Sequence, residues 1–454
     1  MREKVESSKK VAAPANMPVF ARREMNRRDF LKMTGTGLAG AALLGVAGCG
    51  GGGIGGGVQE IVVTFGPDDS GNLQNTIDRF NDEYDGQYSA SWRQMPADSG
   101  QHFDQLKTEL QAGSSDFDAI GGDVIWPAQF ASQGFIVDLS DRFPEDQQSK
   151  FLPATIEANT YQGAIYGVPW RSDAGMLYYR KDLLEQSGFS NPPTTWDELK
   201  QQAQRVMQDS GTKYGFIFQG ANYEGGVTNG LEYIWSSGGE VLDSANNVVV
   251  NSSEAANGLS TERSTVDDSV APSAVSTYKE DEVRSTFLNG DAVFARQWPF
   301  MYGLISDTSQ SSITTDQVGV AALPAAPGGQ SISALGGWNW FINANSGKQD
   351  AAWAWIDFAT SSEQQKNGAI EGSFLPSLKA LYDDQELTDQ VPVVPLARQA
   401  AENTRPRPVS PYYSDMSLKM AEQFNNSLKG SSSPEDALST LQDDLTNIVN
   451  QAQQ

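Results

Sequence analysis

The sequence is poor in the residue types that build disulfides and metal sites. Cysteine and histidine occur once each in 454 residues, as Cys49 and His102. One cysteine cannot form an internal disulfide, and the pair cannot complete a structural zinc site. A Ser/His/Asp triad has only His102 as its base, and this residue stands in a polar helix start where we expect a solvated side chain. The sequence therefore predicts no metal, no cofactor and no serine-hydrolase centre.

Positive charge is also scarce. The chain has 32 Lys and Arg against 57 Asp and Glu. Residues 1–48 hold nine of the basic and four of the acidic residues, so the remainder carries a net charge of −30. Nucleic acid and anionic membrane surfaces are poor partners for such a chain. The acidic composition suits a salty habitat, although acidic proteins also occur elsewhere.

Long hydrophobic runs and internal repeats are missing as well. No apolar segment of the chain reaches the length that spans a bilayer. An acidic surface adhesin or scaffold is expected to contain repeats or long low-complexity stalks, and neither occurs here. These absences disfavour an integral membrane protein and a scaffold.

The amino-terminal residues have the order of an export signal. Arg27 and Arg28 stand just before Phe30-Leu31-Lys32, and the apolar segment 38–47 follows. Small residues then precede Cys49, which resembles the lipobox of lipoproteins behind a twin-arginine signal. We therefore expect residues 1–48 to be a signal peptide and residues 49–57 a glycine-rich tether. Lipid on Cys49 is expected to anchor the exported chain to the outer face of the cytoplasmic membrane.

The mature chain alternates strand and helix patterns. Residues 61–65 read as a buried strand, residues 73–84 as an amphipathic helix, and a second helix carries Phe103, Leu106 and Leu110. Residues 118–125 read as another strand. This βαβα order predicts a mainly parallel α/β sheet, and about 400 mature residues predict two lobes.

Aromatic residues and glycines stand together at two places beyond the apolar stripes. Trp298 follows a strand pattern, and Trp338 follows Gly336 and Gly337. An indole ring can stack on the C–H face of a sugar, and glycines let the backbone approach a ligand. Taken alone, each tryptophan is typical of a hydrophobic core, and a glycine pair is typical of a turn. Tryptophans and glycines in combination favour a sugar site.

Several motifs together resemble one family. In chain order they are residues 166–169, 173–184, 195–199, Gln219 with 223–225, 287–292, 335–338 and 405–413. Their order over more than 200 residues is similar to that of carbohydrate-binding extracellular solute-binding proteins of ABC importers, in particular the trehalose/maltose-type branch. The resemblance implies a monomeric, lipid-anchored binding protein that delivers a sugar to ABC transporter permease subunits.

The resemblance also implies a fold. The family has two α/β lobes joined by crossing strands, with the ligand in the cleft between them. Carried over, the crossings fall near residues 167–171, 292–297 and 333–338. Residues 58–168 and 297–334 are then expected in one lobe, and residues 169–296 and 335–454 in the other. Binding is expected to favour a closed form that the permease recognises.

The resemblance assigns ligand contacts to matching positions. They are Asp68, Asp69, Asp123, Arg171, Asp173, Tyr223, Glu224, Trp298, Gly336, Gly337, Trp338 and Arg407. The structural alternatives are helix capping for Asp123, solvated turns for Asp68 and Asp69, a surface carboxylate for Glu224, and a salt bridge that holds the tail for Arg407. Arg405 replaces Arg407 if the register is shifted by two.

One position departs from the branch. Arg171 stands two residues before Asp173, where the branch commonly has an aromatic residue. This change removes a stacking surface and adds hydrogen-bond donors. A disaccharide of glucose units is the first expected ligand, followed by another neutral sugar or an acidic one.

A secreted glycoside hydrolase is the alternative function. It needs two carboxyl groups about 5–10 Å apart across the scissile bond, and the many Asp and Glu residues leave such a pair possible. The chain has no local signature of that chemistry, and a lipid tether fits a binding protein better. We therefore expect a protein that is not an enzyme.

Overall fold

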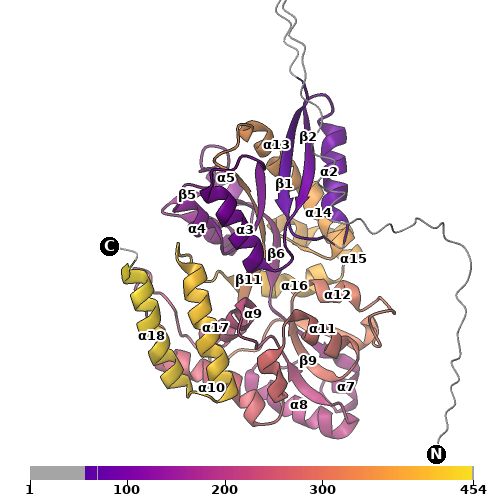
Figure 1. Cartoon of the computed structure of the whole chain (residues 1–454). Helices are drawn as coiled ribbons and strands as arrows, with labels where there is room; N and C mark the ends of the chain where they lie inside the picture. The colour runs from indigo at the N-terminus through magenta and orange to yellow at the C-terminus, as the bar shows by residue number, and fades with distance from the viewer. Residues whose placement is uncertain (1–56, 69, 452–454) are drawn as a thin grey trace, which may run out of the picture. The chain divides into compact units, whose positions relative to one another are not determined.

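The computed structural model describes residues 57–68 and 70–451, which belong to one compact unit beginning at Gly56 (Figure 1). Its strands are β1 (Gln59–Phe65), β2 (Tyr88–Gln94), β3 (Ala119–Asp123), β4 (Thr160–Tyr161), β5 (Ala164–Ile165), β6 (Val168–Ala174), β7 (Met176–Arg180), β8 (Tyr214–Ile217), β9 (Ala292–Gln297), β10 (Val318–Ala321), β11 (Ser333–Ile342), β12 (Leu375–Pro376) and β13 (Thr404–Arg405).

Helices fill most of the connections. They are α2 (Asn72–Glu83), α3 (Ser99–Gln111), α4 (Pro127–Ala131), α5 (Glu145–Gln148), α6 (Pro153–Ala158), α7 (Lys181–Gln186), α8 (Trp196–Ser210), α9 (Glu224–Ser236), α10 (Ser253–Asp267), α11 (Glu280–Leu288), α12 (Phe300–Leu304), α13 (Gln349–Ala359), α14 (Ser362–Gly372), α15 (Gln385–Gln390), α16 (Val393–Glu402), α17 (Tyr413–Lys429) and α18 (Pro434–Gln451). Short 3-10 turns lie at Ser273–Thr277, Thr315–Gln317 and Lys379–Asp383.

The larger sheet has seven strands in the order β12-β6-β11-β3-β1-β2, with β13 paired to β11. β1 pairs in parallel with β2 and with β3, which confirms the predicted parallel α/β start. β11 is antiparallel to β3 and to β6. The sequence analysis does not predict β2, because its polar alternation leaves only Ala90 fully buried and gives a weak strand pattern.

The smaller sheet has four strands in the order β10-β7-β9-β8. β7 is antiparallel to β9 and β10, and β8 is parallel to β9. β6 belongs to the larger sheet and β7 to the smaller one, and only Gly175 separates them. A Cβ atom on Gly175 would lie 2.2 Å from Oε1 of Glu232 and 2.4 Å from Nη2 of Arg296. Glycine is therefore required where the chain passes between the sheets.

The strand pairing corrects the expected division into lobes. Residues 297–334 were assigned to the lobe that contains β1, but β10 pairs with β7 in the smaller sheet. Residues 338–342 were assigned to the other lobe, but they pair with β3, and α13 packs on β1 and β3. After β6 the chain first returns to the larger sheet along β11. The apolar side chains of α13, which follows β11, pack with those of β1 in one core.

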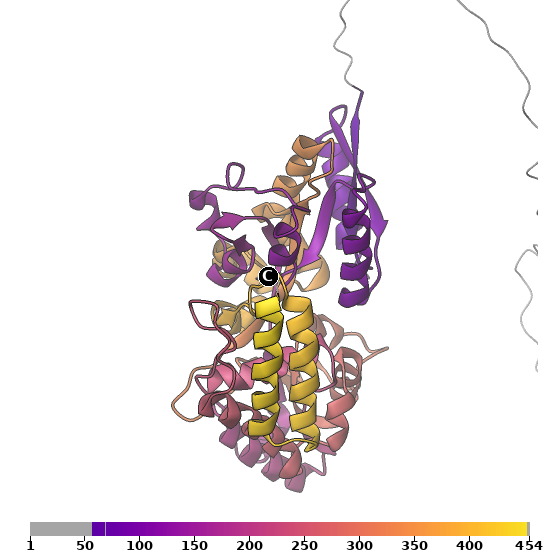
Figure 2. The ribbon, with the colours of Figure 1, turned by 60° about the vertical axis from the view of Figure 1, so that its left-hand side comes forward.

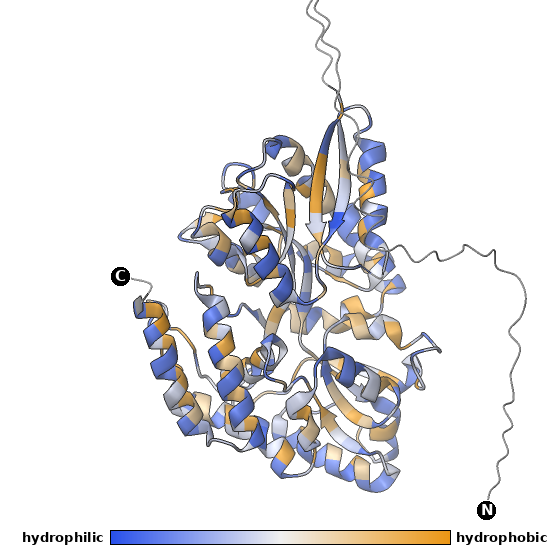
Figure 3. Cartoon of the chain, viewed as in Figure 1, coloured by the Kyte–Doolittle hydropathy of each residue, from blue (hydrophilic) through white to orange (hydrophobic). Residues whose placement is uncertain are grey.

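Helices α9, α10, α17 and α18 form a third packed layer, whose core includes Leu231, Leu259, Phe424 and Leu441. Helices α17 and α18 run side by side at the carboxyl end (Figure 2). The serine-rich segment 252–275 predicts an exposed, locally irregular helical excursion, and most of it is the helix α10, whose first turn is capped by the Ser252 hydroxyl. Hydrophobic residues concentrate on the strands and the inward helix faces (Figure 3).

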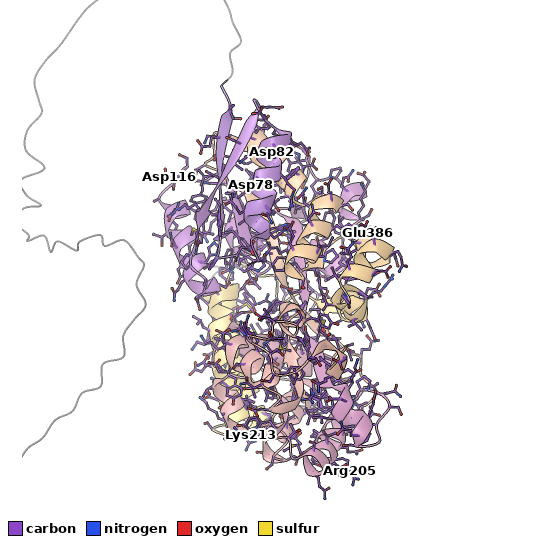
Figure 4. All side chains as sticks on the ribbon, turned by 90° about the vertical axis from the view of Figure 1, so that its right-hand side faces the viewer. Asp78, Asp82, Asp116, Arg205, Lys213 and Glu386 are labelled. Carbon is purple, nitrogen blue, oxygen red and sulfur yellow. The ribbon has the colours of Figure 1, made fainter. Side chains whose placement is uncertain are left out.

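Charged side chains cover the outside. Asp78 and Asp82 lie exposed on α2, and Asp116, Arg205, Lys213 and Glu386 also face solvent (Figure 4). Within residues 57–68 and 70–451, no helix combines the length and apolar character needed to cross a membrane. The predicted signal residues Arg27 and Arg28, the lipidation site Cys49 and most of the tether lie outside the described residues.

Candidate functional site

Five predicted residues meet on three neighbouring strands of the larger sheet. Trp338 of β11 stands opposite Asp123, the last residue of β3. Gly336 of β11 stands opposite Asp173 of β6, and Trp338 also faces Arg171 across the same pair of strands. Strand pairing alone therefore brings together two carboxylates and an indole that lie far apart in the sequence.

The glycine pair is required by crowding. Gly337 has a φ of 119°, and a Cβ atom there would lie 2.2 Å from the carbonyl oxygen of Arg171. A Cβ atom on Gly336 would lie 3.1 Å from the Cβ of Asp173 and 3.1 Å from the Trp298 ring. Bare backbone at Gly336 thus lets the Trp298 ring lie against β11 beside Asp173.

Trp298 is half-buried and held from several directions. Its backbone N–H donates to Oε1 of Gln297 at 3.0 Å, and its carbonyl accepts from the Tyr178 hydroxyl at 3.0 Å. The guanidinium carbon of Arg296 lies 3.9 Å from the centroid of its ring, a distance typical of a cation–π contact. Its ring is therefore fixed in place before any ligand binds.

Trp338 is half-buried against three other rings. The Phe65 ring meets it edge-on with centroids 4.9 Å apart, and Trp126 is also edge-on at 6.0 Å. The His102 ring lies nearly parallel to it, with centroids 6.2 Å apart and an interplanar angle of 25°.

The expectation of a solvated His102 is wrong. The residue is fully buried, and neither ring nitrogen has a hydrogen-bond partner among the described residues. Burial lowers the pKa of His102 to about 4, so its imidazole is neutral at neutral pH. It stands four residues before Leu106 on the apolar stripe of α3, and that spacing is the signal which the sequence analysis overlooked.

Arg407 joins residues from separate elements. Its Nη1 donates to Oε1 of Glu224 at 2.6 Å, and its Nη2 lies 3.4 Å from Oδ1 of Asp123 and donates to the carbonyl oxygen of Leu335 at 3.2 Å. Burial by itself lowers the pKa of Arg407, but the negative charges of Glu224 and Asp123 together with Tyr413 outweigh it, so the pKa lies above its usual value. Arg407 is therefore a fixed cation.

Glu224 is engaged from three sides. Besides Arg407, the Tyr413 hydroxyl donates to Oε1 at 2.5 Å, and the Ser417 hydroxyl donates to Oε2. It is the first residue of α9, where a carboxylate is favoured by the helix dipole. Its side chain nevertheless keeps 26% of its surface exposed, so it is not the plain surface carboxylate of the structural alternative.

Asp123 has partners as well. Its Oδ2 accepts from the Ser99 hydroxyl at 3.0 Å, and its Oδ1 accepts from the backbone N–H of Ile125 at 3.3 Å. Burial raises the pKa of Asp123, and the charge of Glu224 adds to this, while Arg407 and Ser99 oppose it; the net direction is upward. The contact with Ile125 is a turn contact and not the capping of a long helix.

The alternative Arg405 lies elsewhere. Its Nη2 donates to Oε2 of Glu240 at 2.6 Å, and its guanidinium carbon lies 5.4 Å from the Trp235 ring centroid. Neither contact involves a predicted site residue, and 39% of its side chain is exposed. The geometry therefore favours the register with Arg407 in the site.

Arg171 is buried between two rings. Its guanidinium carbon lies 3.7 Å from the Trp170 centroid and 3.6 Å from the Phe374 centroid. Its Nη2 donates to Oδ1 of Asn72 at 3.0 Å and lies 3.6 Å from Oδ2 of Asp68. Burial lowers the pKa of Arg171 to about 10, although nearby carboxylates oppose this. Its Nη2 is thus engaged within the protein.

Asp68 lies at the entry to α2. Its carboxylate accepts from the hydroxyl and backbone N–H of Ser70 and from the backbone N–H of Leu73 at 2.6 Å. Burial raises its pKa, but Arg171 and these hydrogen bonds outweigh that effect and leave the pKa of Asp68 below its usual value. It is a buried capping residue and not a solvated turn residue. Asp69 lies outside the described residues.

Asp173 differs from the other carboxylates. It is half-buried, and in the described part of the chain it has neither a hydrogen bond nor an ion pair. Burial raises the pKa of Asp173 to about 7, with Arg171 and Arg296 opposing the shift and Asp123 adding to it. Asp173 therefore has free acceptor oxygens at the centre of the cluster.

Tyr223 lies at the edge of this group. It precedes α9, and its hydroxyl stands 2.1 Å from where a Cβ atom on Gly225 would lie. The ammonium of Lys279 lies 4.9 Å from its ring centroid. Tyr223 precedes Glu224 directly, but its hydroxyl has no hydrogen-bond partner among the described residues.

The sequence analysis missed several contributors. Phe374 contributes the second ring against Arg171, and Arg296 forms an ion pair with Glu232 in which both side chains are at most 2% exposed. Phe374 follows the left-handed Ser373 after α14, and no local pattern signals its partner. Arg296 was visible as an arginine at the end of a strand pattern directly before Trp298.

A surface hollow of about 590 Å³ lies apart from this group. Residues of α8, α9 and α10 and the turn 326–329 line it, among them Trp196, Ser260 and Gly328. None of the predicted site residues lines it. We therefore place the candidate site at the strand ends, where the aromatic and charged side chains converge.

Comparison with known proteins gives a consistent result. The sequence profile of the bacterial extracellular solute-binding proteins matches residues 68–366. A protein of Deinococcus radiodurans named "Probable ABC transporter-binding protein" is 34% identical over 363 residues, which cover 78% of this chain and 85% of the relative.

Solved structures show the same fold. The maltose-bound protein MalE3 of T. maritima superposes with a TM-score of 0.78 at 37% identity, covering 86% of this chain and 100% of that chain. The GacH receptor of Streptomyces glaucescens, solved unliganded and with acarbose, superposes with a TM-score of 0.75 at 24% identity, covering 87% and 99%. The architecture is therefore the two-lobed fold of periplasmic sugar-binding proteins.

Proposed function

The chain belongs to the bacterial extracellular solute-binding protein family, and from this premise we propose that it binds an extracellular sugar between its two lobes and delivers it to an ABC import permease. The name of the relative from D. radiodurans and the maltose in the T. maritima structure support this function. A glucose-containing disaccharide of the trehalose or maltose type is the proposed ligand. The alternative of a glycoside hydrolase gains no support from these comparisons.

One observation carries the proposal. The half-buried indole of Trp298 lies against the bare backbone of Gly336 beside the unpaired carboxylate of Asp173, and a second half-buried indole, Trp338, follows Gly337 on the same strand. Indole faces stack on the C–H surface of a pyranose, while ionised oxygens accept strong hydrogen bonds from its hydroxyls. This combination suits a sugar better than an apolar or a planar ligand.

The roles of the residues follow from their surroundings. Asp173, Asp123 and Glu224 are proposed to accept from sugar hydroxyls, with Arg407 holding the last two in position. Arg171 is proposed to act through Asp68 and the rings around it. Tyr223 and Asp69 are proposed contacts at the rim of the site.

The location of the protein is part of the proposal. Residues 1–48 are proposed to direct export through Arg27 and Arg28, and Cys49 to carry the lipid that anchors a monomer to the membrane. In cells expressing the full chain, Cys49→Ser is expected to abolish radiolabelling by fatty acid and to release the protein from the membrane fraction. Substituting both arginines by lysine is expected to retain the chain in the cytoplasm. Unchanged labelling of the Cys49→Ser variant contradicts the anchor.

Calorimetry tests the binding function. The full chain carrying Cys49→Ser is titrated with trehalose, maltose, sucrose and glucose, and each sugar is analysed by chromatography afterwards. We expect saturable binding of one disaccharide that is recovered intact. Cleavage of the sugar contradicts a pure binding role, and no binding of any sugar contradicts the proposed function.

A matched pair of tryptophans tests the site. Trp338→Ala is expected to weaken binding of that disaccharide at least about tenfold, since a stacking ring contributes more than about 1 kcal/mol. Trp353→Ala changes another half-buried tryptophan, which lies on α13, and is expected to leave the dissociation constant unchanged. Equal losses in the two variants contradict the placement of the site.

A further inference from the structure

We propose that this site excludes anionic sugars and accepts neutral or cationic ones, with Asp173 as the residue that makes the distinction. The inference rests on the proposed sugar-binding function and names the charge class of its ligand. An acidic sugar was among the ligands that the sequence left open, and the arrangement of charges at the strand ends argues against it.

The three arginines of the site are withdrawn from a ligand. The side chains of Arg171, Arg296 and Arg407 are only 8%, 1% and 4% exposed. Each lies against a carboxylate, at 3.6 Å from Asp68, 2.6 Å from Glu232 and 2.6 Å from Glu224, respectively.

Three of their other nitrogens are out of reach too. Nε of Arg171, Nη1 of Arg296 and Nε of Arg407 are buried and have no acceptor in the described part of the chain. A ligand carboxylate therefore finds no free guanidinium edge on Arg296 or Arg407, although bidentate pairing with arginine is the usual way to bind one.

The carboxylates of the site are, in contrast, more exposed than its arginines. Asp123 and Glu224 keep 15% and 26% of their side chains exposed. Asp173 is half-buried and has no ion pair or hydrogen bond in residues 57–68 and 70–451. A ligand thus meets carboxylate oxygens that accept hydrogen bonds but cannot donate them.

The consequences differ by ligand charge. A hydroxyl of a neutral sugar donates a hydrogen bond to the Asp173 carboxylate. An ammonium of a cationic sugar adds a favourable charge interaction with the same carboxylate. A second carboxylate brought next to Asp173 is repelled in a partly buried site, where the interaction is stronger than in water. Like charges placed together in a binding site cost several kcal/mol when nothing compensates them.

The discrimination is expected to depend on pH through Asp173. The titratable and charged groups that face it come from its own strand, from three further strands and from one 3-10 turn: Arg171, Asp123, Arg296, Tyr178 and Tyr382. Burial raises the pKa values of both tyrosines, so they stay neutral between pH 5 and 8.

Asp173 is therefore the group that changes charge in this range. Burial raises its pKa to about 7, so the site becomes more negative as the pH rises past 7. Asp123, whose pKa burial also raises, acts in the same direction. An anionic sugar is expected to bind more weakly at pH 8 than at pH 5.5, and a cationic one more tightly.

The test compares three ligands that differ at one position. Trehalose, 6-amino-6-deoxytrehalose and the 6-carboxylate of trehalose are titrated into the full chain carrying Cys49→Ser at pH 5.5 and pH 8. We expect the carboxylate to bind at least tenfold more weakly than trehalose at pH 8 and the amine at least as tightly as trehalose. The gap between carboxylate and trehalose is expected to narrow at pH 5.5. If maltose is the neutral binder, the same series is made on maltose.

Two variants locate the effect. Asp173→Asn keeps the size of the side chain and is expected to reduce the preference for trehalose over its carboxylate at least fivefold at pH 8. Asp82→Asn removes one negative charge from the exposed face of α2 (Figure 4) and is expected to leave that preference unchanged. Equal effects of the two variants overturn the role of Asp173.

The outcomes separate this inference from the proposed function. If the protein binds trehalose or maltose but binds the corresponding carboxylate equally well or more tightly, the inference is overturned. The sugar-binding function is then still supported. Failure of every neutral sugar to bind overturns the function itself. If Asp173→Asn does not fold, the wild-type protein still provides the test. A ratio of the dissociation constants of the carboxylate and trehalose that is the same at pH 5.5 and pH 8 contradicts control by Asp173.

Discussion

Arg296 and Glu232 form a doubly hydrogen-bonded ion pair, with Nη2 to Oε1 at 2.6 Å and Nε to Oε2 at 3.0 Å. The pair lies directly against Gly175, where β6 of one sheet passes into β7 of the other. Oε1 of Glu232 also accepts from the backbone N–H of Ala334 in β11 at 3.0 Å. One ion pair therefore connects α9, β9 and β11 at the point where β6 passes into β7.

Breaking this pair is expected to be costly. Arg296→Met leaves Glu232 buried without its cation, and we expect the free energy of unfolding to fall by about 3–5 kcal/mol, as for other buried ion pairs that lose one partner. Urea denaturation measures the loss. The double variant Arg296→Met with Glu232→Leu is expected to recover part of it, because no buried charge then remains. A double variant less stable than the single one contradicts this account.

The glycine pair gives a second prediction. Gly337→Ala places a methyl group 2.2 Å from the carbonyl of Arg171 at a φ of 119°, so backbone has to move. We expect a loss of more than about 3 kcal/mol in unfolding free energy, from the sum of clash and strain. Thermal and urea denaturation measure it.

Gly328→Ala is the matched control. Gly328 also has a positive φ, 77°, but a Cβ atom there meets nothing within 4 Å. Only the backbone preference is then lost, and about 1 kcal/mol is expected. A similar loss at the two glycines means that crowding at Gly337 contributes nothing.

Much of the fold was predictable because local patterns specify it. The stripe of Leu73, Ile77 and Phe80 fixes α2, and the spacing of Thr195 and Glu198 predicts the capping box that begins α8. The parallel start of the larger sheet follows from the order of these elements. The family resemblance then added the second lobe.

The division between the lobes was not predictable for a physical reason. β10 and β11 are both largely buried strands, and nothing in either sequence says which sheet each one joins. Register is decided by partners distant in the chain, such as Tyr179 for Gly319 and Gly122 for Asn339. Without those contacts, the local sequence pattern fits equally well whether residues 297–334 are assigned to one lobe or to the other.

The site was predictable by residue type but not by pairing. The resemblance named Arg171, Asp173 and Arg407; Arg171 and Asp173 lie on β6, Arg407 contacts Asp123 of β3, and their role in binding a ligand stays a prediction. It did not indicate that Arg171 lies between Trp170 and Phe374, or that Asp173 has no partner. Such pairings depend on side-chain packing across elements, which single-sequence patterns do not encode.

Two nearby arginines give a third prediction. Arg407→Ala leaves Glu224 and Asp123 without their shared cation, so we expect a loss of about 3 kcal/mol in stability and at least tenfold weaker sugar binding. Arg405→Ala breaks a half-exposed pair with Glu240 and is expected to cost less than about 1 kcal/mol. Calorimetry and urea denaturation measure both quantities. A larger loss of binding at Arg405 restores the alternative register.

His102 gives the last prediction, on acid stability. Its pKa of about 4 in the folded chain lies below the ordinary value of 6.5, so the unfolded chain binds the proton more tightly. Stability from this group is complete above pH 6.5 and is lost as the pH falls from 6.5 to 4, by about 3 kcal/mol at 1.4 kcal/mol per pH unit.

His102→Leu breaks no hydrogen bond, because neither ring nitrogen has a partner among the described residues. The variant is expected to unfold with nearly wild-type free energy at pH 7 and to lose less stability towards pH 4. Asp104→Asn, on the exposed face of the same helix, controls for the change in charge, and an unchanged acid slope in His102→Leu refutes the assignment of that slope to the buried imidazole.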